Sequence, residues 1–177
     1  PLQSGSNAVL RAMRRGYTRE GYRALLERVT ARGPVGIGAD VIVGFPGEDD
    51  EMFEETRRFL EEAPVTFLHV FRYSPRPGTT AARLGTAERL GPPASDGRSR
   101  ERSETLRVLG EVKAEAFRRS LIGSTLPVVP ESGRGERGPI AMSDLYVPVE
   151  LTREPSSRGV VPVRILDVKR KRLIGAP

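Results

Sequence analysis

The residues best suited to chemistry lie in a glycine-rich loop at residues 44–47, Gly-Phe-Pro-Gly. The loop follows residues 39–43, a short apolar and β-branched run that is typical of a strand buried on both faces. Acidic residues at 49–51 come next, where they favour the start of a helix. In α/β folds a loop between a strand and a helix lies at the ligand-binding edge, and its glycines let the backbone approach a ligand closely. A plain tight turn explains the same pattern equally well.

Two residue types are too scarce for several other kinds of site. The chain has no cysteine, which excludes disulfides, thiolate metal sites and iron–sulfur ligation within this segment. The single histidine, His69, excludes a zinc site of the usual kind, and its apolar surroundings favour a core position. A phosphate site at the loop is the weakest hypothesis, because no lysine stands close by. No apolar run reaches the roughly 20 residues of a membrane span, so no membrane partner is expected.

The net charge of +6 is unevenly distributed along the 177 residues. Residues 1–97 hold 13 Lys and Arg against 13 Asp and Glu, residues 98–120 hold 7 against 4, and residues 121–177 hold 9 against 6. A neutral part followed by a basic part indicates a catalytic segment joined to one that meets an anionic polymer. An arginine-rich solvated surface explains the excess nearly as well.

The elements that must position the loop alternate between strands and helices. Residues 1–6 are interpreted as a strand end, with Ser6 as the N-cap of a helix, and Thr18 should cap the next helix. Beyond the loop, another helix precedes a strand at residues 65–71. This order indicates a parallel sheet or barrel, but about three strands are too few to close a barrel. We therefore expect an N-terminal half outside this segment.

The pattern changes after a linker expected at residues 85–97 and a helix expected at 98–120. Four segments with a period near two follow: TLPVVPE, DLYVPVEL, VVPVRILDV and RLIGA. About five such strands predict a small antiparallel β-barrel of the nucleic-acid-binding sort over residues 121–177. The predicted fold class is α/β followed by β, with parts at residues 1–97, 98–120 and 121–177.

Three stretches together resemble one family: PLQSGSNAVLRAMRRGYT, DVIVGFPGEDDEMFEET and HVFRYSPRPGTTAARL. In this order they are similar to the C-terminal half of the radical S-adenosylmethionine methylthiotransferases. The final β region resembles the TRAM domain that these enzymes carry for RNA contact. The resemblance implies the C-terminal part of a (β/α)6 radical-SAM partial barrel, followed by a TRAM-like β-barrel.

The third stretch is most similar to the branch that adds a methylthio group at C2 of N6-threonylcarbamoyladenosine 37 in tRNA. Three alternatives stay open: the branch acting on isopentenyladenosine, the branch modifying a ribosomal protein, and a non-catalytic RNA-binding module. The resemblance implies that one [4Fe–4S] cluster cleaves S-adenosylmethionine to a 5′-deoxyadenosyl radical, which removes hydrogen from adenine C2. A second [4Fe–4S] cluster delivers sulfur, and another S-adenosylmethionine supplies the methyl group.

The cysteines for both clusters lie upstream of Pro1 in the family, so this segment is expected to be inactive alone. The implied partners are the anticodon stem-loop of tRNA, a sulfur donor and an electron donor. The implied location is the cytoplasm.

By the same resemblance, three strand ends form half of the cofactor cradle. The expected cofactor-binding residues are Gln3, Ser4, Arg15, Ile42, Gly44, Phe45, Pro46, Tyr73 and Ser74. The first two suit polar methionine and ribose atoms, Arg15 suits the methionine carboxylate, and the others suit a dry slot for adenine. Each also has a structural interpretation, such as Arg15 pairing with Glu20 or the aromatic rings packing in the core. Glu48 matches a family position, although it can equally serve only the helix dipole.

The expected RNA-binding residues lie in the last part of the chain: Tyr146, Lys169, Arg170, Lys171 and Arg172. The four cations occupy the turn expected between the last two strands, and each phosphate that they neutralise would release counterions. A solvated turn explains them equally well. Residues 141–146 depart from the family, which tends to have a glycine and an asparagine in this turn, but Tyr146 can still stack on a base.

Overall fold

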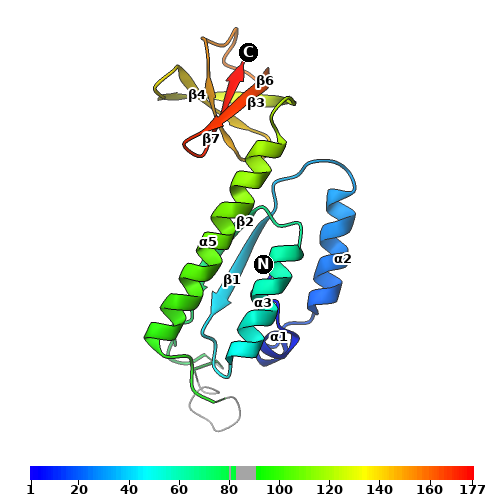
Figure 1. Cartoon of the computed structure of the whole chain (residues 1–177), viewed down its shortest axis with the longest axis vertical. Coiled ribbons are helices and arrows are strands. Elements are labelled where there is room, and N and C mark those ends of the chain that lie inside the picture. Colours follow the sequence, from blue (N-terminus) through cyan, green and yellow to red (C-terminus); the bar gives the residue numbers. More distant parts are fainter. Residues whose placement is uncertain (80, 83–90) are drawn as a thin grey trace. The chain divides into compact units, whose positions relative to one another are not determined.

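The computed structural model describes residues 1–79, 81–82 and 91–177, which form two compact units. The first unit is Pro1–Val112 and the second is Lys113–Pro177. The boundary falls within helix α5 (Asp96–Ser120), which contains the helix predicted at 98–120 (Figure 1). Most of the linker predicted at 85–97 lies outside the described residues. No helix in the described ranges is long and apolar enough to cross a membrane.

The first unit has the predicted alternation of helices and parallel strands. Its other elements are α1 (Asn7–Ala12), α2 (Arg19–Thr30), β1 (Gly38–Val43), α3 (Asp50–Glu62) and β2 (Phe67–Arg72). β1 and β2 pair in parallel, with Ile42 opposite Phe71 (Figure 1). The strand expected at residues 1–6 is reduced to one parallel bridge between Gln3 and Val41. The parallel α/β character is confirmed, and the described sheet of this unit has two strands.

The helix starts follow local hydrogen bonding with one exception. Thr18 caps α2 by accepting a hydrogen bond from the Gly21 N–H, and Asp49 caps α3 by accepting one from Met52. The expected side-chain cap at Ser6 is wrong, since its hydroxyl makes no cap bond with α1. Instead, the Ser6 N–H donates to the Ser4 hydroxyl, so the chain before α1 is organised by Ser4.

One face of β1 forms the centre of the core of the first unit. This core comprises Leu2, Leu26, Ala39, Val41, Val43, Phe59, Leu60, Ala63, Val65, Val70 and Leu106. The prediction that the strand is buried on both faces is wrong, because the alternate residues Asp40 and Ile42 are only half-buried. His69, expected in the core, lies on that same open face. Its side chain is 66% exposed and its Nδ1 lies 3.2 Å from Asp40.

The second unit is a closed five-stranded barrel. Its strands are β3 (Thr125–Arg134), β4 (Pro139–Ser143), β5 (Pro148–Leu151), β6 (Val161–Lys169) and β7 (Arg172–Ala176), in the order β3-β4-β5-β7-β6. The all-antiparallel prediction is wrong at one pairing, because β5 and β7 run parallel. β4 matches none of the four predicted segments, since it has only five residues between glycine- and aspartate-containing turns.

Gly138 marks the closest backbone approach in this barrel. A Cβ at this position would overlap the carbonyl oxygen of Leu151, a backbone atom that cannot move aside. We expect Gly138→Ala to destabilise the barrel by about 1–3 kcal/mol, as overpacking does. Urea denaturation of the full chain measures this change. The control is Gly133→Ala, where the added Cβ would lie 3.7 Å from Ile140. Equal stability of the two variants would contradict the prediction.

Candidate functional site

A cavity of about 430 Å³ opens where β1 and β2 end. Ile42 and Phe71, neighbours across the two strands, line it together. Phe45 and Tyr73 follow the same strand ends, and their ring centroids lie 5.3 Å apart at an interplanar angle of 73°. Carboxyl ends of parallel strands are where α/β proteins bind ligands. The cavity is therefore the candidate ligand site of the first unit.

The structure brings six of the nine predicted cofactor-binding residues together around this cavity. They are Gln3, Arg15, Ile42, Phe45, Tyr73 and Ser74. Three sequence segments that are far apart along the chain thus converge on one cavity. Arg15 is exposed there, and its alternative partner Glu20 instead accepts hydrogen bonds from Asn7 and Arg19.

The other three predicted residues lie behind the cavity wall. Ser4 is fully buried, and its hydroxyl lies 3.0 Å from the Thr56 hydroxyl and accepts from the Ser6 N–H. Gly44 and Pro46 are buried in the loop and do not line the cavity. Gly44 has φ +77, and a Cβ there would overlap Ser99. None of the three is among the residues that line the cavity, and their predicted role in cofactor binding stays a prediction.

The cavity combines apolar walls with a few polar groups. The Tyr73 hydroxyl is buried and has no hydrogen-bond partner within the described ranges. An unpartnered buried hydroxyl is costly, so a ligand acceptor at this point would be favourable. Gln3 has φ +69, and its backbone N–H and C=O both bond to β1, at Asp40 and Ile42. Such a conformation is uncommon outside glycine and concentrates at functional sites.

Sequence reasoning missed a buried ion pair directly behind the cavity wall. Glu48, interpreted from the sequence as a match to a family position or as a contributor to the helix dipole, lies 2.7 Å from Arg102 of α5, and both side chains are at most 3% exposed. The Gly44 N–H donates to the same carboxylate oxygen of Glu48 at 2.5 Å. Burial raises the pKa of Glu48, against the opposing effects of the Gly44 N–H and the Arg102 guanidinium. Local pattern could not reveal a partner 54 residues away.

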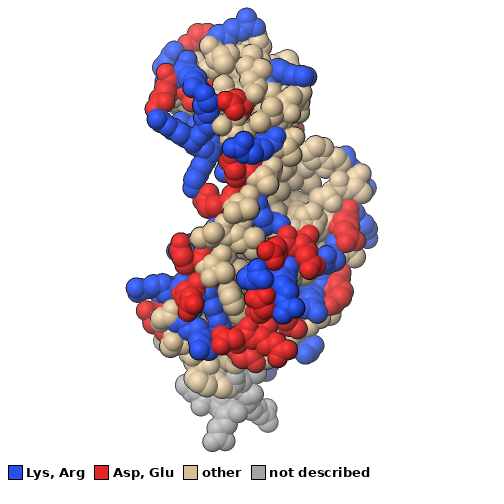
Figure 2. Space-filling view, in the orientation of Figure 1, with Lys and Arg blue, Asp and Glu red and all other residues tan. Residues whose placement is uncertain are grey.

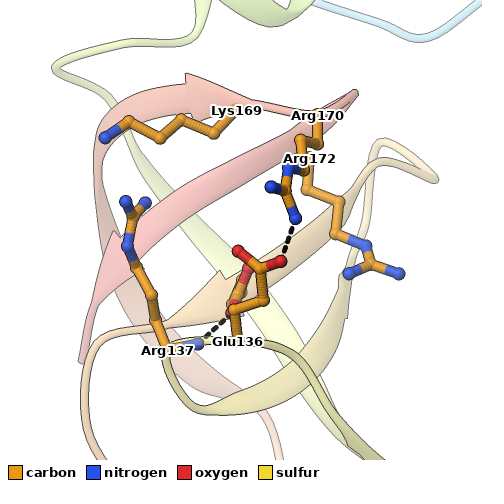
Figure 3. Close-up of a pocket in the computed structure, with 6 residues that line it drawn as sticks. Glu136, Arg137, Lys169, Arg170 and Arg172 are labelled. Atoms are coloured by element: carbon orange, nitrogen blue, oxygen red, sulfur yellow. Dashed lines mark hydrogen bonds and ion pairs between the residues drawn. The ribbon is translucent and has the colours of Figure 1, made fainter.

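A second cavity, of about 360 Å³, lies on the barrel. Basic side chains predominate around it, and its lining residues are Glu136, Arg137, Glu150, Lys169, Arg170 and Arg172 (Figure 3). We call it the basic cleft. In Figure 3 Lys169 and Arg137 extend along the same side of the cleft. Arg170 pairs with Glu136, and the buried Glu150 accepts a hydrogen bond from the Arg137 N–H. Among the described residues, Arg137 and Arg172 form no ion pair, so they are available to an anion.

The predicted basic run occupies the tip of the β6–β7 hairpin. Lys169 pairs with Arg172, which leaves Arg170 and Lys171 as a two-residue turn. Their φ angles are +47 and +65, the conformation that such turns normally give to Asn-Gly. Three of the four cations line the basic cleft, and Lys171 does not.

Tyr146 lies apart from the cleft, in the β4–β5 turn. It has φ +57 and is 84% exposed.

Charge is balanced on the first unit. Figure 2 shows acidic and basic side chains interspersed over its helices. Several are paired, as in Arg23–Glu62 and Arg57–Glu54, both at distances below 3 Å. The described residues contain no cluster of three His, Asp or Glu side chains that could hold a metal ion. The basic cleft on the second unit is therefore the stronger candidate for an anionic polymer.

The chain is similar to known proteins over most of its length. Residues 1–60 match the model of the Radical SAM superfamily. The chain is 34% identical, over 99% of its length, to tRNA-2-methylthio-N(6)-dimethylallyladenosine synthase of Bartonella henselae, of which it covers 37%. It is 42% identical over 117 residues to threonylcarbamoyladenosine tRNA methylthiotransferase MtaB of Aquifex aeolicus, which is 66% of the chain and 27% of that relative. A synthase of Opitutus terrae is 54% identical over 86 residues, 48% of the chain and 18% of the relative.

These relatives confirm the predicted similarity to radical-SAM tRNA methylthiotransferases. They do not confirm the threonylcarbamoyl branch, because relatives named for both adenosine modifications match. The chain spans 37% or less of the length of the three relatives named above.

Proposed function

We propose that this chain is the cofactor- and RNA-contacting C-terminal part of a radical S-adenosylmethionine tRNA methylthiotransferase. The observation that carries the proposal is the convergence of Gln3 and Arg15, Ile42 and Phe45, and Tyr73 and Ser74 on one cavity. These pairs come from the three stretches that resemble the family. The matching Radical SAM model and the tRNA-modifying relatives support the same conclusion.

The cavity fits S-adenosylmethionine by its chemistry. Ile42, Phe45 and Phe71 offer apolar surface to an adenine ring, and the Tyr73 hydroxyl offers a hydrogen-bond donor that has no partner in the described chain. Arg15 lines the cavity, and its guanidinium would attract the carboxylate of the methionine moiety. When bound beside an iron–sulfur cluster, S-adenosylmethionine supplies hydrogen abstraction and a methyl group. The residues of this chain would orient it and exclude water.

The substrate that we infer is an adenosine of tRNA already modified at N6. The sequence of residues 69–84 favours the threonylcarbamoyl group, whereas relatives that align with 99% of the chain are named for the dimethylallyl group. We place the adenosine in the anticodon stem-loop and the reaction in the cytoplasm. Both iron–sulfur clusters, the electron donor and the sulfur donor would be supplied from outside this chain.

We infer that the basic cleft and the hairpin tip contact tRNA phosphates. Arg137, Lys169 and Arg172 line the cleft, with Lys169 and Arg137 on the same side of it, and nearby cations attract a polyanion strongly at low salt (Figure 3). Tyr146, at 84% exposure, offers a ring on which an unpaired base could stack. The cleft is a property of the barrel alone, so this inference does not depend on the cofactor cavity.

The cofactor pocket is tested by binding of S-adenosylhomocysteine to the chain, measured by isothermal titration calorimetry. We expect saturable binding that Tyr73→Phe weakens about fivefold, because a hydrogen bond contributes about 1 kcal/mol. The same change should leave the unfolding free energy equal or higher, since it removes an unpartnered buried hydroxyl. Tyr22→Phe, outside the cavity, is the matched control and should bind normally. Absence of saturable binding by the unaltered chain would contradict the proposal.

A further inference from the structure

The Glu48 carboxylate closes the glycine-rich loop on itself. It accepts the Gly44 N–H at 2.5 Å, while the Glu48 N–H donates to the Phe45 carbonyl at 2.9 Å. Two bonds therefore define the path of the backbone between Gly44 and Glu48. Phe45 lies inside this closed segment, and its ring forms part of the cavity wall beside Tyr73. Any shift of Glu48 would move the Phe45 ring.

Arg102 of α5 holds that carboxylate from the other side. Its Nη1 donates to Glu48 twice, to the side chain at 2.7 Å and to the main-chain oxygen at 3.1 Å. Its Nη2 donates to Asp50 at 2.8 Å, and the guanidinium lies 5.3 Å from the centre of the Phe53 ring. The planar fork therefore reaches both the end of the loop and the start of α3. A lysine could not make this set of contacts.

The cost of this arrangement argues for a role beyond stability. Burying two charges is expensive, and a well-packed apolar pair is often as stable or more so. Glu48 Oε1 and Arg102 Nε even remain without hydrogen-bond partners in the described chain. What the ion pair provides, and an apolar pair does not, is a defined direction for the Gly44 N–H and thus for the loop.

We infer that Arg102 is a positioning residue for the cofactor cavity: acting through Glu48, it fixes the Gly44–Phe45 segment that forms one wall. This inference rests on the proposed function of the cavity. It assigns to α5 a part in cofactor binding, although no residue of α5 lines the cavity.

The test compares Arg102→Met with Arg98→Met in the full chain. Arg98 lies one turn earlier on α5 and pairs with Asp50 at 3.0 Å, but it does not touch Glu48. We expect Arg102→Met to weaken binding of S-adenosylhomocysteine at least about tenfold, and Arg98→Met to change it less than about twofold. The Gly44 amide resonance should shift in the first variant and not in the second. Arg102→Lys, which keeps only the charge, should bind between the two.

Asp50→Asn replaces Arg102→Met in this test if the Arg102→Met variant does not fold. Asp50 is 72% exposed, so this change loosens Arg102 without leaving a buried charge alone, and we expect severalfold weaker binding with a shifted Gly44 amide. If the unaltered chain fails to bind the probe, the proposed cofactor cavity is overturned, and this inference with it. If the unaltered chain binds and the folded Arg102 or Asp50 variant binds equally well, with the Gly44 amide unmoved, the inference alone is overturned.

Discussion

Arg102→Met should lower the free energy of unfolding of the first unit by about 3–5 kcal/mol at neutral to alkaline pH, the usual cost of removing one partner from a buried ion pair. The Glu48 side chain has no exposed surface, so its charge would be left with the Gly44 N–H as its hydrogen-bond donor. Urea denaturation followed by circular dichroism measures the change, because the described helices belong to this unit apart from the end of α5.

The free energy of unfolding that Arg102→Met loses should increase with pH. Burial raises the pKa of Glu48 above its value of 4.5 in the unfolded chain, and Arg102 opposes that rise. Without Arg102 the folded-state pKa rises further. A raised pKa contributes stability that is present below the unfolded pKa and is lost as the pH climbs through the folded pKa. Relative to the unaltered chain, the free energy of unfolding of Arg102→Met should therefore be reduced least at about pH 5 and most at about pH 8.

Arg98→Met is the control for this pH dependence, because it breaks only an exposed pair with Asp50. It should cost at most about 1 kcal/mol, with little change over the same pH range. If Arg102→Met lost the same free energy of unfolding at both ends of that range, Glu48 would not titrate between them. The explanation by the charge of Glu48 would then be wrong.

The double change Arg170→Asn/Lys171→Gly should move stability and RNA affinity in opposite directions. Both residues have left-handed φ angles at the β6–β7 turn, a conformation that costs side-chain-bearing residues roughly 1–2 kcal/mol each. Asn-Gly is the preferred sequence for such a turn. The variant should therefore unfold at higher urea concentration. For RNA binding, losing two cations should reduce the slope of the logarithm of the association constant against the logarithm of the salt concentration by about 1.4–1.8.

Fluorescence anisotropy of a labelled anticodon stem-loop, titrated over about 50 to 200 mM salt, measures this loss. Arg158→Asn is the matched control, since Arg158 is exposed on the same barrel and does not line the basic cleft. An unchanged salt slope in the double variant, with the barrel stabilised as expected, would remove the hairpin tip from the RNA-contacting surface.

Local sequence patterns located the elements and the loop that the cavity needs. The β-branched run at residues 39–43 is a strand, the acidic residues at 49–51 start α3, and Thr18 caps α2. These features depend on neighbours within about one helical turn, which a pattern can register. The resemblance then selected six residues that do line one cavity.

The failures share a different physical cause. The Ser6 hydroxyl is buried without a hydrogen-bond partner among the described residues, and the chain before α1 is instead held by Ser4, which contacts Thr56 far along the chain. His69 is exposed because the described residues leave one face of the two-stranded sheet open. The Glu48–Arg102 pair joins positions 54 residues apart. Each outcome is decided by tertiary contacts, which override local preference and leave no periodic signal.

Closure of the barrel depends on the strand that comes last among the five in the sequence. β7 comes last among the barrel strands, yet it lies between β5 and β6 in the closed ring. Until residues 172–176 have emerged from the ribosome, the nascent β5 and β6 each present an unpaired edge, which invites pairing with other chains. The β6–β7 turn is thus the last local step before ring closure, so an unfavourable turn at Arg170 and Lys171 would prolong the open-edged state.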